Sequence, residues 1–315
     1  MIKVYTKQGS SGKYWHDLGD SKVYSNGEWY YIKCTDKIFL NGKWHEIGSS
    51  VNPLTFTSYL TGGTVSLIAS SAAAESSNVD MYYRKNYGEW KPYTLGTGIV
   101  GGGDLFNERG SVIQFWNKTN TLSSLSDGKI RMFYFKISGY FKLSGNVCSL
   151  INYSTYVPEY CFYGLFEGQS ISVENFEINV SSVRPHGMDR MFADTKADLD
   201  NKGHFRIEAD YPYTESFISM FENSTAITHA DLMVTLKRDC TDCFYQLFYN
   251  SSVKSVRVGF TDWLSRDPGD PGGGVTTTRW MYGVSKTGTF YKPTALETWY
   301  DDVYGIPEGW TVVNE

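Results

Sequence analysis

The amino-acid sequence predicts a mainly β protein built from three successive parts. Residues 1–50 contain a duplicated phrase with Asn-Gly turns, residues 51–147 contain short stretches of alternating polar and apolar residues, and residues 148–315 repeat one phrase several times. These patterns predict an N-terminal β-hairpin module, an antiparallel β-sandwich and an irregular repeat solenoid with short helical turns. The composition fits this fold class, because 16% of the residues are aromatic and only 20% are charged.

The hairpin module is predicted from two phrases of the same pattern, "KVYSNGEWYYI" at 22–32 and "KIFLNGKWHEI" at 37–47. Each has an Asn-Gly pair between alternating side chains, and this pair supplies the two positive φ angles of a type I′ hairpin turn. A weaker third copy ends in "GKYWHDL". The equivalent tryptophans either pack one hairpin on the next or form an aromatic docking surface. These tryptophans are Trp15, Trp29 and Trp44.

The sandwich is predicted for residues 51–147, where stretches such as "TVSLIAS" and "IRMFYFKI" alternate and are separated by Gly, Asn and Ser turns. No helical pattern interrupts them. The glycine-rich stretch "GIVGGGDLF" at 98–106 lacks the Gly-Lys-Ser/Thr ending of a phosphate-binding loop. We therefore expect a turn there.

The solenoid is predicted from a phrase that recurs along residues 148–315. "CFYGLFEG" at 161–168 and "CFYQLFYN" at 243–250 agree at five positions, and "MDRMFAD" and "FISMFEN" lie between them with the same frame. The central phenylalanines are Phe166, Phe192, Phe221 and Phe248, so the steps are 26, 29 and 27 residues. Apolar residues at i, i+3 and i+4 predict a short helical turn in each unit. The expected core residues are Phe162, Leu165, Phe166, Met191, Phe192, Met220, Phe221, Phe244, Leu247 and Phe248.

Each of these phrases is followed by a stretch with the period of a half-buried strand, such as "FEINV" at 176–180 and "FRIEA" at 205–209. Such a unit is too small to bury its own apolar face, so neighbouring units must stack. The recurring residues are therefore predicted to form the core of a solenoid, and residues 278–313 its closing segment.

The cysteines and histidines give no motif for chemistry. Cys161 and Cys243 occupy the same repeat position, which favours packing. Cys240 and Cys243 form a lone Cys-x-x-Cys without a second pair at zinc spacing, and the five histidines show no paired-ligand spacing. We expect no cofactor and no metal, and only weak calcium binding stays open at "RDPGDPGGG" (266–274).

Catalysis is likewise not indicated. Carboxylates of the kind that a glycosidase needs are present, for example Asp301-Asp302 or Asp80 with Glu89, but no constellation can be assembled from them. The sequence therefore predicts a protein that is not an enzyme.

The net charge of −5 and the absence of a Lys/Arg cluster argue against nucleic-acid binding. No apolar run has the length of a membrane span, and "MIKVYTKQGSSG" lacks the apolar core of a signal peptide. We expect a chain that is made and folded in a cytoplasm.

The repeat phrases, the lead-in "FKLSGNVCSLI" (141–151) and the segment 278–313 resemble leucine-rich-repeat surface proteins of the BspA-like type. They are more similar to virion structural proteins of gut bacteriophages, including crAss-like phages, which place an immunoglobulin-like sandwich before such repeats. The resemblance covers about residues 50–315, and the "NGEW" and "NGKW" hairpins are similar to N-terminal segments of phage virion proteins. It implies a leucine-rich-repeat-like solenoid at 148–315, an immunoglobulin-like domain at 51–147 and virion anchoring through 1–50.

The function implied by the resemblance is that of a non-catalytic virion protein, a tail or head appendage that presents a host-surface attachment domain. Its expected partners are other virion proteins and a glycan or protein of the host surface, with homo-oligomerisation left open. One alternative is a decoration, or cementing, protein that binds only virion subunits. A second alternative is a bacterial surface adhesin, which would need a signal peptide.

Overall fold

The computed structural model describes the strands of residues 1–50 and residues 53–58, 61–70, 79–104, 109–126, 129–197, 203–236, 240–263 and 276–315. The chain is mainly β, and the one helix within these ranges is the short 3-10 helix η4 (Val147–Ile151). The predicted mainly β class is therefore confirmed.

The N-terminal residues form three separate antiparallel strand pairs. In each pair a tryptophan stands opposite another aromatic residue in the backbone register: Trp15 opposite Tyr5, Trp29 opposite Tyr24 and Trp44 opposite Phe39. The Asn-Gly turns and all side chains of this module lie outside the described residues, so the role of the three tryptophans stays a prediction. The pairs are β1 (Ile2–Lys7) with β2 (Lys13–Leu18), β3 (Lys22–Ser25) with β4 (Glu28–Tyr31), and β5 (Asp36–Leu40) with β6 (Lys43–Ile47).

Two sheets pack face to face over residues 53–145, which we call the two-layer segment. Phe56 and Phe115 of one sheet contact Phe135 of the other, with ring centroids 4.9 and 5.2 Å apart. In order across it, the first sheet contains β10 (Lys91–Pro92), β9 (Met81–Lys85), β13 (Arg109–Asn117), β7 (Leu54–Ser58) and β17 (Phe141–Gly145), with β12 (Gly103–Asp104) also on β13. The second contains β11 (Ile99–Val100), β8 (Thr64–Ala69) and β16 (Phe133–Ser138), and β14 (Ser124–Ser126) pairs separately with β15 (Lys129–Arg131).

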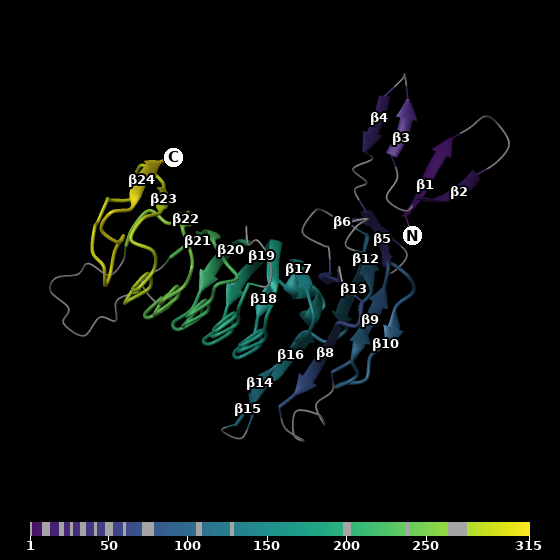
Figure 1. The fold of residues 1–315 in the computed structure, drawn as a ribbon, viewed down its shortest axis with the longest axis horizontal. Coiled ribbons are helices and arrows are strands. Elements are labelled where there is room, and N and C mark those ends of the chain that lie inside the picture. Colours follow the sequence, from purple (N-terminus) through teal and green to yellow (C-terminus); the bar gives the residue numbers. More distant parts are fainter. Residues whose placement is uncertain are drawn as a thin grey trace.

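The first sheet continues directly into a parallel sheet that takes one strand from each coil (Figure 1). The register aligns Ile178, Ile207, Leu232 and Val258 across four neighbouring strands, and all four side chains are buried. The predicted stacking of repeats is therefore confirmed. The strands are β19 (Ser172–Val183), β20 (His204–Pro212), β21 (His229–Val234), β22 (Ser255–Val258), β23 (Thr289–Lys292) and β24 (Thr311–Asn314), with β18 (Tyr156–Val157) beside β19.

The other side of each coil is a chain of overlapping β-turns, so the predicted short helical turns are wrong. In the first coil the N–H groups of Cys161, Tyr163 and Leu165 each donate to the carbonyl three residues earlier, at 3.2 Å. Positive φ angles recur every four residues, at Tyr160, Gly164 and Gly168. We call these segments, at 158–168, 185–194, 214–223, 241–250 and 276–283, the turn ribbons.

A helix is excluded because alternate amides of each turn ribbon bond to the next ribbon. Phe162 donates to the carbonyl of Gly187 at 2.8 Å, and Phe166 donates to that of Met191 at 2.9 Å. An α-helix would use the same amides within itself. The ribbon buries residues in adjacent pairs with a period of four, and such pairs also place apolar residues at i, i+3 and i+4. The helical pattern and the ribbon pattern are therefore the same over one unit.

A ladder of phenylalanine rings runs through the ribbons. Phe135 of β16 stacks on Phe166, which is followed by Phe192, Phe221 and Phe248, with successive centroids 5.4, 5.0, 5.7 and 5.3 Å apart. A fifth ribbon continues the stack with Trp280 and Met281, both buried. The segment expected to close the solenoid therefore contributes a further coil.

The two-layer segment and the solenoid share both layers and one core. Phe135 in β16 donates to the carbonyl of Leu165 at 2.8 Å, so the second sheet leads into the first turn ribbon. In the other layer β17 pairs antiparallel with β7 and parallel with β19. The N-terminal end of the first coil is thus covered by the two-layer segment and is not exposed to solvent.

Candidate interaction surfaces

The repeat-core residues expected from the sequence all lie inside the molecule. Phe162, Leu165, Phe166, Met191, Phe192, Met220, Phe221, Phe244, Leu247 and Phe248 are each at most 1% exposed. Residues that meet a partner must therefore come from the outward positions of the ribbons, of the parallel strands and of the two-layer segment.

The outward face of the ribbons is crossed by an ion network centred on Arg190. Its guanidinium lies 2.7 Å from Glu167 Oε1 in the preceding ribbon and 3.1 Å from Glu222 Oε2 in the following one. Asp194 of the same ribbon is 3.3 Å away. The hydrogen bond to Glu167 is the largest cause that raises the pKa of Arg190. The network ties three coils together, and its one guanidinium faces three carboxylates, so a net negative charge remains on this face.

A second group on this face surrounds His186. Its ring stacks on Tyr160 at 4.8 Å and lies 3.1 Å from Asp189 Oδ2 and 3.0 Å from Glu215 Oε2. The side chain of Asp189 is only 9% exposed, and its Oδ1 atom has no hydrogen-bond partner. Burial therefore raises the pKa of Asp189 to about 6, against the lowering effect of the hydrogen bond from His186.

The outward face of the parallel sheet carries charges of alternating sign in one row. The register aligns Glu177, Arg206, Asp231, Arg257 and Tyr291 on successive strands. Asp231 lies 3.5 Å from Arg206 and 4.0 Å from Arg257, whose guanidinium also stands 5.0 Å from the ring centre of Tyr291. This face is therefore largely neutralised by its own neighbours.

The two-layer segment carries half-buried aromatic rings beside cations, on β9 and β13 and in the residues that follow these strands. Tyr82, Trp116 and Trp90 follow one another with centroids 5.5 and 5.9 Å apart. Arg84 stands 4.7 Å from the ring centre of Trp90, and Lys118 stands 4.3 Å from that of Tyr82. We call these five residues the aromatic cluster. Rings with polar tips and cations at a partly exposed site are the side chains that recur at protein and ligand contacts.

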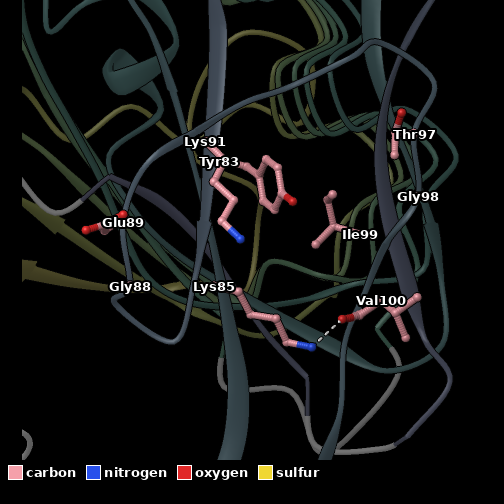
Figure 2. A pocket seen from close by; sticks show the side chains of 9 residues that line it. All are labelled: Tyr83, Lys85, Gly88, Glu89, Lys91, Thr97, Gly98, Ile99 and Val100. Carbon is pink, nitrogen blue, oxygen red and sulfur yellow. Dashed lines mark hydrogen bonds between the residues drawn. The ribbon is translucent and has the colours of Figure 1, made fainter.

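An open depression of about 460 Å³ lies between β9 and β11 (Figure 2). Tyr83, Lys85 and Lys91 line one side, and Ile99 and Val100 of β11 line the other. Lys85 Nζ donates to the carbonyl of Val100 at 2.9 Å and so bridges the two sides. Glu89 and Thr97 also line the depression, and one of its two ammonium groups is used in this bridge.

The glycine-rich stretch expected to be a turn contains the short strands β11 and β12. A Cβ atom at Gly101 would lie 2.6 Å from the Cβ atom of Ser58, so the close approach of this backbone requires glycine. Residues 105–108 of this stretch and the acidic loop at 266–274 lie outside the described residues.

Three of the four carboxylates considered for catalysis have structural partners, and the fourth, Glu89, is exposed. Asp301 Oδ1 accepts from the backbone N–H groups of Val303 and Tyr304 at 2.7 and 2.9 Å, and Asp302 Oδ1 accepts from Glu308 at 3.0 Å. Asp80 pairs with Lys118 at 3.6 Å. Within the described ranges, no three His, Cys, Asp or Glu side chains are grouped to hold a metal ion.

Four cysteines are buried free thiols: Cys148, Cys161, Cys240 and Cys243. Burial raises the pKa of Cys161 to about 12 and raises that of Cys243 as well. The Cys240 thiol donates to the carbonyl of Pro212 at 3.1 Å. These thiols pack in the core and are not poised as nucleophiles.

No protein-family model, no curated protein and no solved structure matches this chain. No helix in the part of the chain that the structure describes is long and apolar enough to cross a membrane. The outward surfaces themselves therefore carry the functional proposal.

Two features were missed from the sequence. The fifth coil was readable in "RWMYG" at 279–283, where Trp280 and Met281 replace the usual Leu-Phe pair, followed by "TFYK" at 289–292. No local pattern predicts the aromatic cluster, because Tyr82 and Trp116 lie on strands that are distant in sequence and become neighbours only when β9 pairs with β13.

Proposed function

We propose that this protein is a non-catalytic structural component of a bacteriophage virion, a tail or head appendage that contributes to host-surface attachment. The observation that carries the proposal is the single core shared by the two-layer segment and the solenoid. A shared core with both layers hydrogen-bonded through the junction makes a stiff, extended support. Such a support suits presentation of a surface at a distance from its mounting point.

In this proposal the two-layer segment is an immunoglobulin-like domain and the coils are a divergent leucine-rich-repeat-like solenoid. The hairpin module at 1–50 fixes the protein to other virion proteins. Antiparallel pairs of four to six residues have little area to bury alone, which supports a role that depends on a partner.

The aromatic cluster is the proposed contact with the host surface, either a glycan or a protein. It differs from the two solenoid faces because three rings and two cations are gathered in one cluster. Aromatic and arginine side chains contribute most of the binding energy at many interfaces.

The attachment role is tested with particles that carry Tyr82→Ala and Trp116→Ala together. We expect normal assembly and adsorption to host cells reduced by about tenfold or more, which is the effect of losing central aromatic contacts. Tyr140→Ala is the matched control, because Tyr140 is an exposed tyrosine outside the cluster. The purified wild-type protein should compete with particles for adsorption, and the double variant should not.

The same particles separate attachment from cementing. Particles that lack the protein should assemble but adsorb poorly; unstable particles would instead assign it to cementing. Unchanged adsorption of the double variant would remove the aromatic cluster from the proposal. The absence of catalysis is tested by incubating the purified protein with host capsular polysaccharide, where new reducing ends would contradict the proposal.

A further inference from the structure

Among the described residues, β24 is the outermost strand of the parallel sheet. β24 pairs with β23 on one side, and no described residue pairs with its other side. In a parallel ladder the N–H and C=O groups of one residue point to the same neighbour, and those of the next residue point the opposite way. Thr311 and Glu315 donate to Gly288 and Lys292 on the β23 side, each at 2.9 Å. The backbone groups of Val312 and Asn314 therefore point out of the open edge.

The strand at the opposite end of the same sheet has features that prevent pairing with a further strand, whereas β24 lacks them. That end is β10, whose two residues are Lys91 and Pro92, both exposed. A short strand with a lysine and a proline resists further pairing, because proline has no N–H group and lysine opposes burial. The sequence of β24 is TVVN, with two β-branched valines, no proline and no charge. Such a strand favours pairing.

We propose that β24 is a self-association site, at which two copies of the chain pair edge to edge in an antiparallel manner about a two-fold axis at Val313. This register brings Val312 opposite Asn314 of the second copy, and Asn314 opposite its Val312. These are the residues whose backbone groups point outward, so both pairs can exchange hydrogen bonds, about four in all. The strand is therefore complementary to itself, as a two-fold interface requires.

The side chains fit the same register. Val313 lies on the solvent face beside Tyr291, so Val313 would meet its own copy between two tyrosines. The coil that ends in β24 also exposes Tyr300 at 49% and Tyr304 at 37%, two of the large apolar side chains that the solenoid leaves exposed. The carbonyls of Val303 and Tyr304 accept from Arg279 and Thr277 of the fifth ribbon, so this segment lies in the ribbon layer and the proposed interface rests on β24 itself. The inference does not depend on the virion assignment.

The test is sedimentation velocity of the purified chain over about a hundredfold range of concentration, because a dimer dissociates on dilution. We expect a monomer–dimer equilibrium in the wild type. Asn314→Pro should abolish the dimer, since it removes an N–H that points out of the edge and none that pairs with β23. Val313→Lys should also give a monomer, because two like charges would stand directly opposite each other.

A charge-complementation experiment guards against misfolding as the cause. The Val313→Glu chain should be monomeric alone, and an equal mixture of the Val313→Lys and Val313→Glu chains should form a dimer again. Val100→Lys, at an exposed valine of the two-layer segment, is the matched control and should dimerise like the wild type. A wild type that stays monomeric at every concentration would overturn the proposal. A dimer that survives Asn314→Pro and both Val313 substitutions would also overturn it, by placing self-association elsewhere.

Discussion

At the scale of single residues, Asp189 shows how the stacking of coils changes the chemistry of a side chain. Its carboxylate lies between two ribbons, with His186 as a hydrogen-bond partner for one oxygen and no partner for the other. In the unfolded chain the same group is in water. Its pKa is therefore about 6 in the folded protein and near the ordinary value of 3.8 when unfolded.

This difference predicts that Asp189→Asn stabilises the protein more at neutral pH than at acid pH. A raised folded-state pKa means that the contribution of Asp189 is fully favourable below the unfolded pKa and is lost as the pH rises through about 6. Asparagine mimics the neutral form at every pH. Relative to wild type, the variant should gain up to about 3 kcal/mol in unfolding free energy between about pH 4 and about pH 8.

Urea unfolding at a series of pH values measures this gain. A difference between variant and wild type that does not change with pH would show that Asp189 has the same pKa in both states.

At the scale of elements, the turn ribbons depend on left-handed residues at regular intervals. Most of these residues are not glycine; Arg190, Ser219, Gln246 and Arg279 occupy one column with φ between 49° and 54°. Side chains other than glycine cost about 1–2 kcal/mol in this conformation. The backbone bonds between ribbons and the buried pairs offset this cost in every coil.

Gln246 gives a test of this backbone. Its side chain is half-buried, and its backbone N–H donates to the carbonyl of Thr278 at 3.0 Å. Gln246→Gly should raise the unfolding free energy by up to about 1 kcal/mol, because glycine adopts positive φ freely. Gln246→Val should lower it by about 1–2 kcal/mol, because a β-branched residue is strained there. Chemical denaturation measures both. If the ribbon were helical, Gln246→Gly would instead lower the unfolding free energy, because glycine is unfavourable within helices.

At the scale of the whole molecule, the junction makes the two-layer segment and the first coils one unit. Phe56 of β7 contacts Phe135 of the second sheet at 4.9 Å and Phe166 of the first ribbon at 6.3 Å. In a stack of repeats each unit is stabilised by its neighbours, so a defect spreads mainly to adjacent coils. The two-layer segment therefore acts as the cap of the solenoid at its N-terminal end.

Phe56→Ala should accordingly reduce hydrogen-exchange protection in β13 and in β19 and β20 together. The expected loss of stability is about 3–5 kcal/mol, as for other buried phenylalanines. Phe290→Ala, near the other end of the solenoid, is the matched control and should expose β22 to β24 first, because Phe290 is equally buried and lies in β23. If Phe56→Ala left the protection of β19 and β20 unchanged, the junction would not couple the two parts.

The core residues of the solenoid could be predicted from the sequence, because equivalent buried side chains recur at nearly regular intervals along the chain. Phe166, Phe192, Phe221 and Phe248 recur at nearly constant steps, and a side chain that must be buried in every coil leaves a periodic mark. The backbone that carries these rings could not be read, since one apolar pattern fits both a helical turn and a turn ribbon. Bonds between coils, such as that from Phe162 to Gly187, select the ribbon.

The composition of the outward surfaces could not be predicted from the sequence either, because neighbouring side chains there come from distant segments. Arg190 meets Glu167 and Glu222 from two other coils, and Tyr82 meets Trp116 from another strand, so no local pattern marks these neighbours. Among the described residues, β24 is unpaired on its outer side because of its place in the strand order, which no local pattern records. Local spacing records which side chains avoid water, whereas pairing between distant segments determines which side chains and backbone groups face a partner.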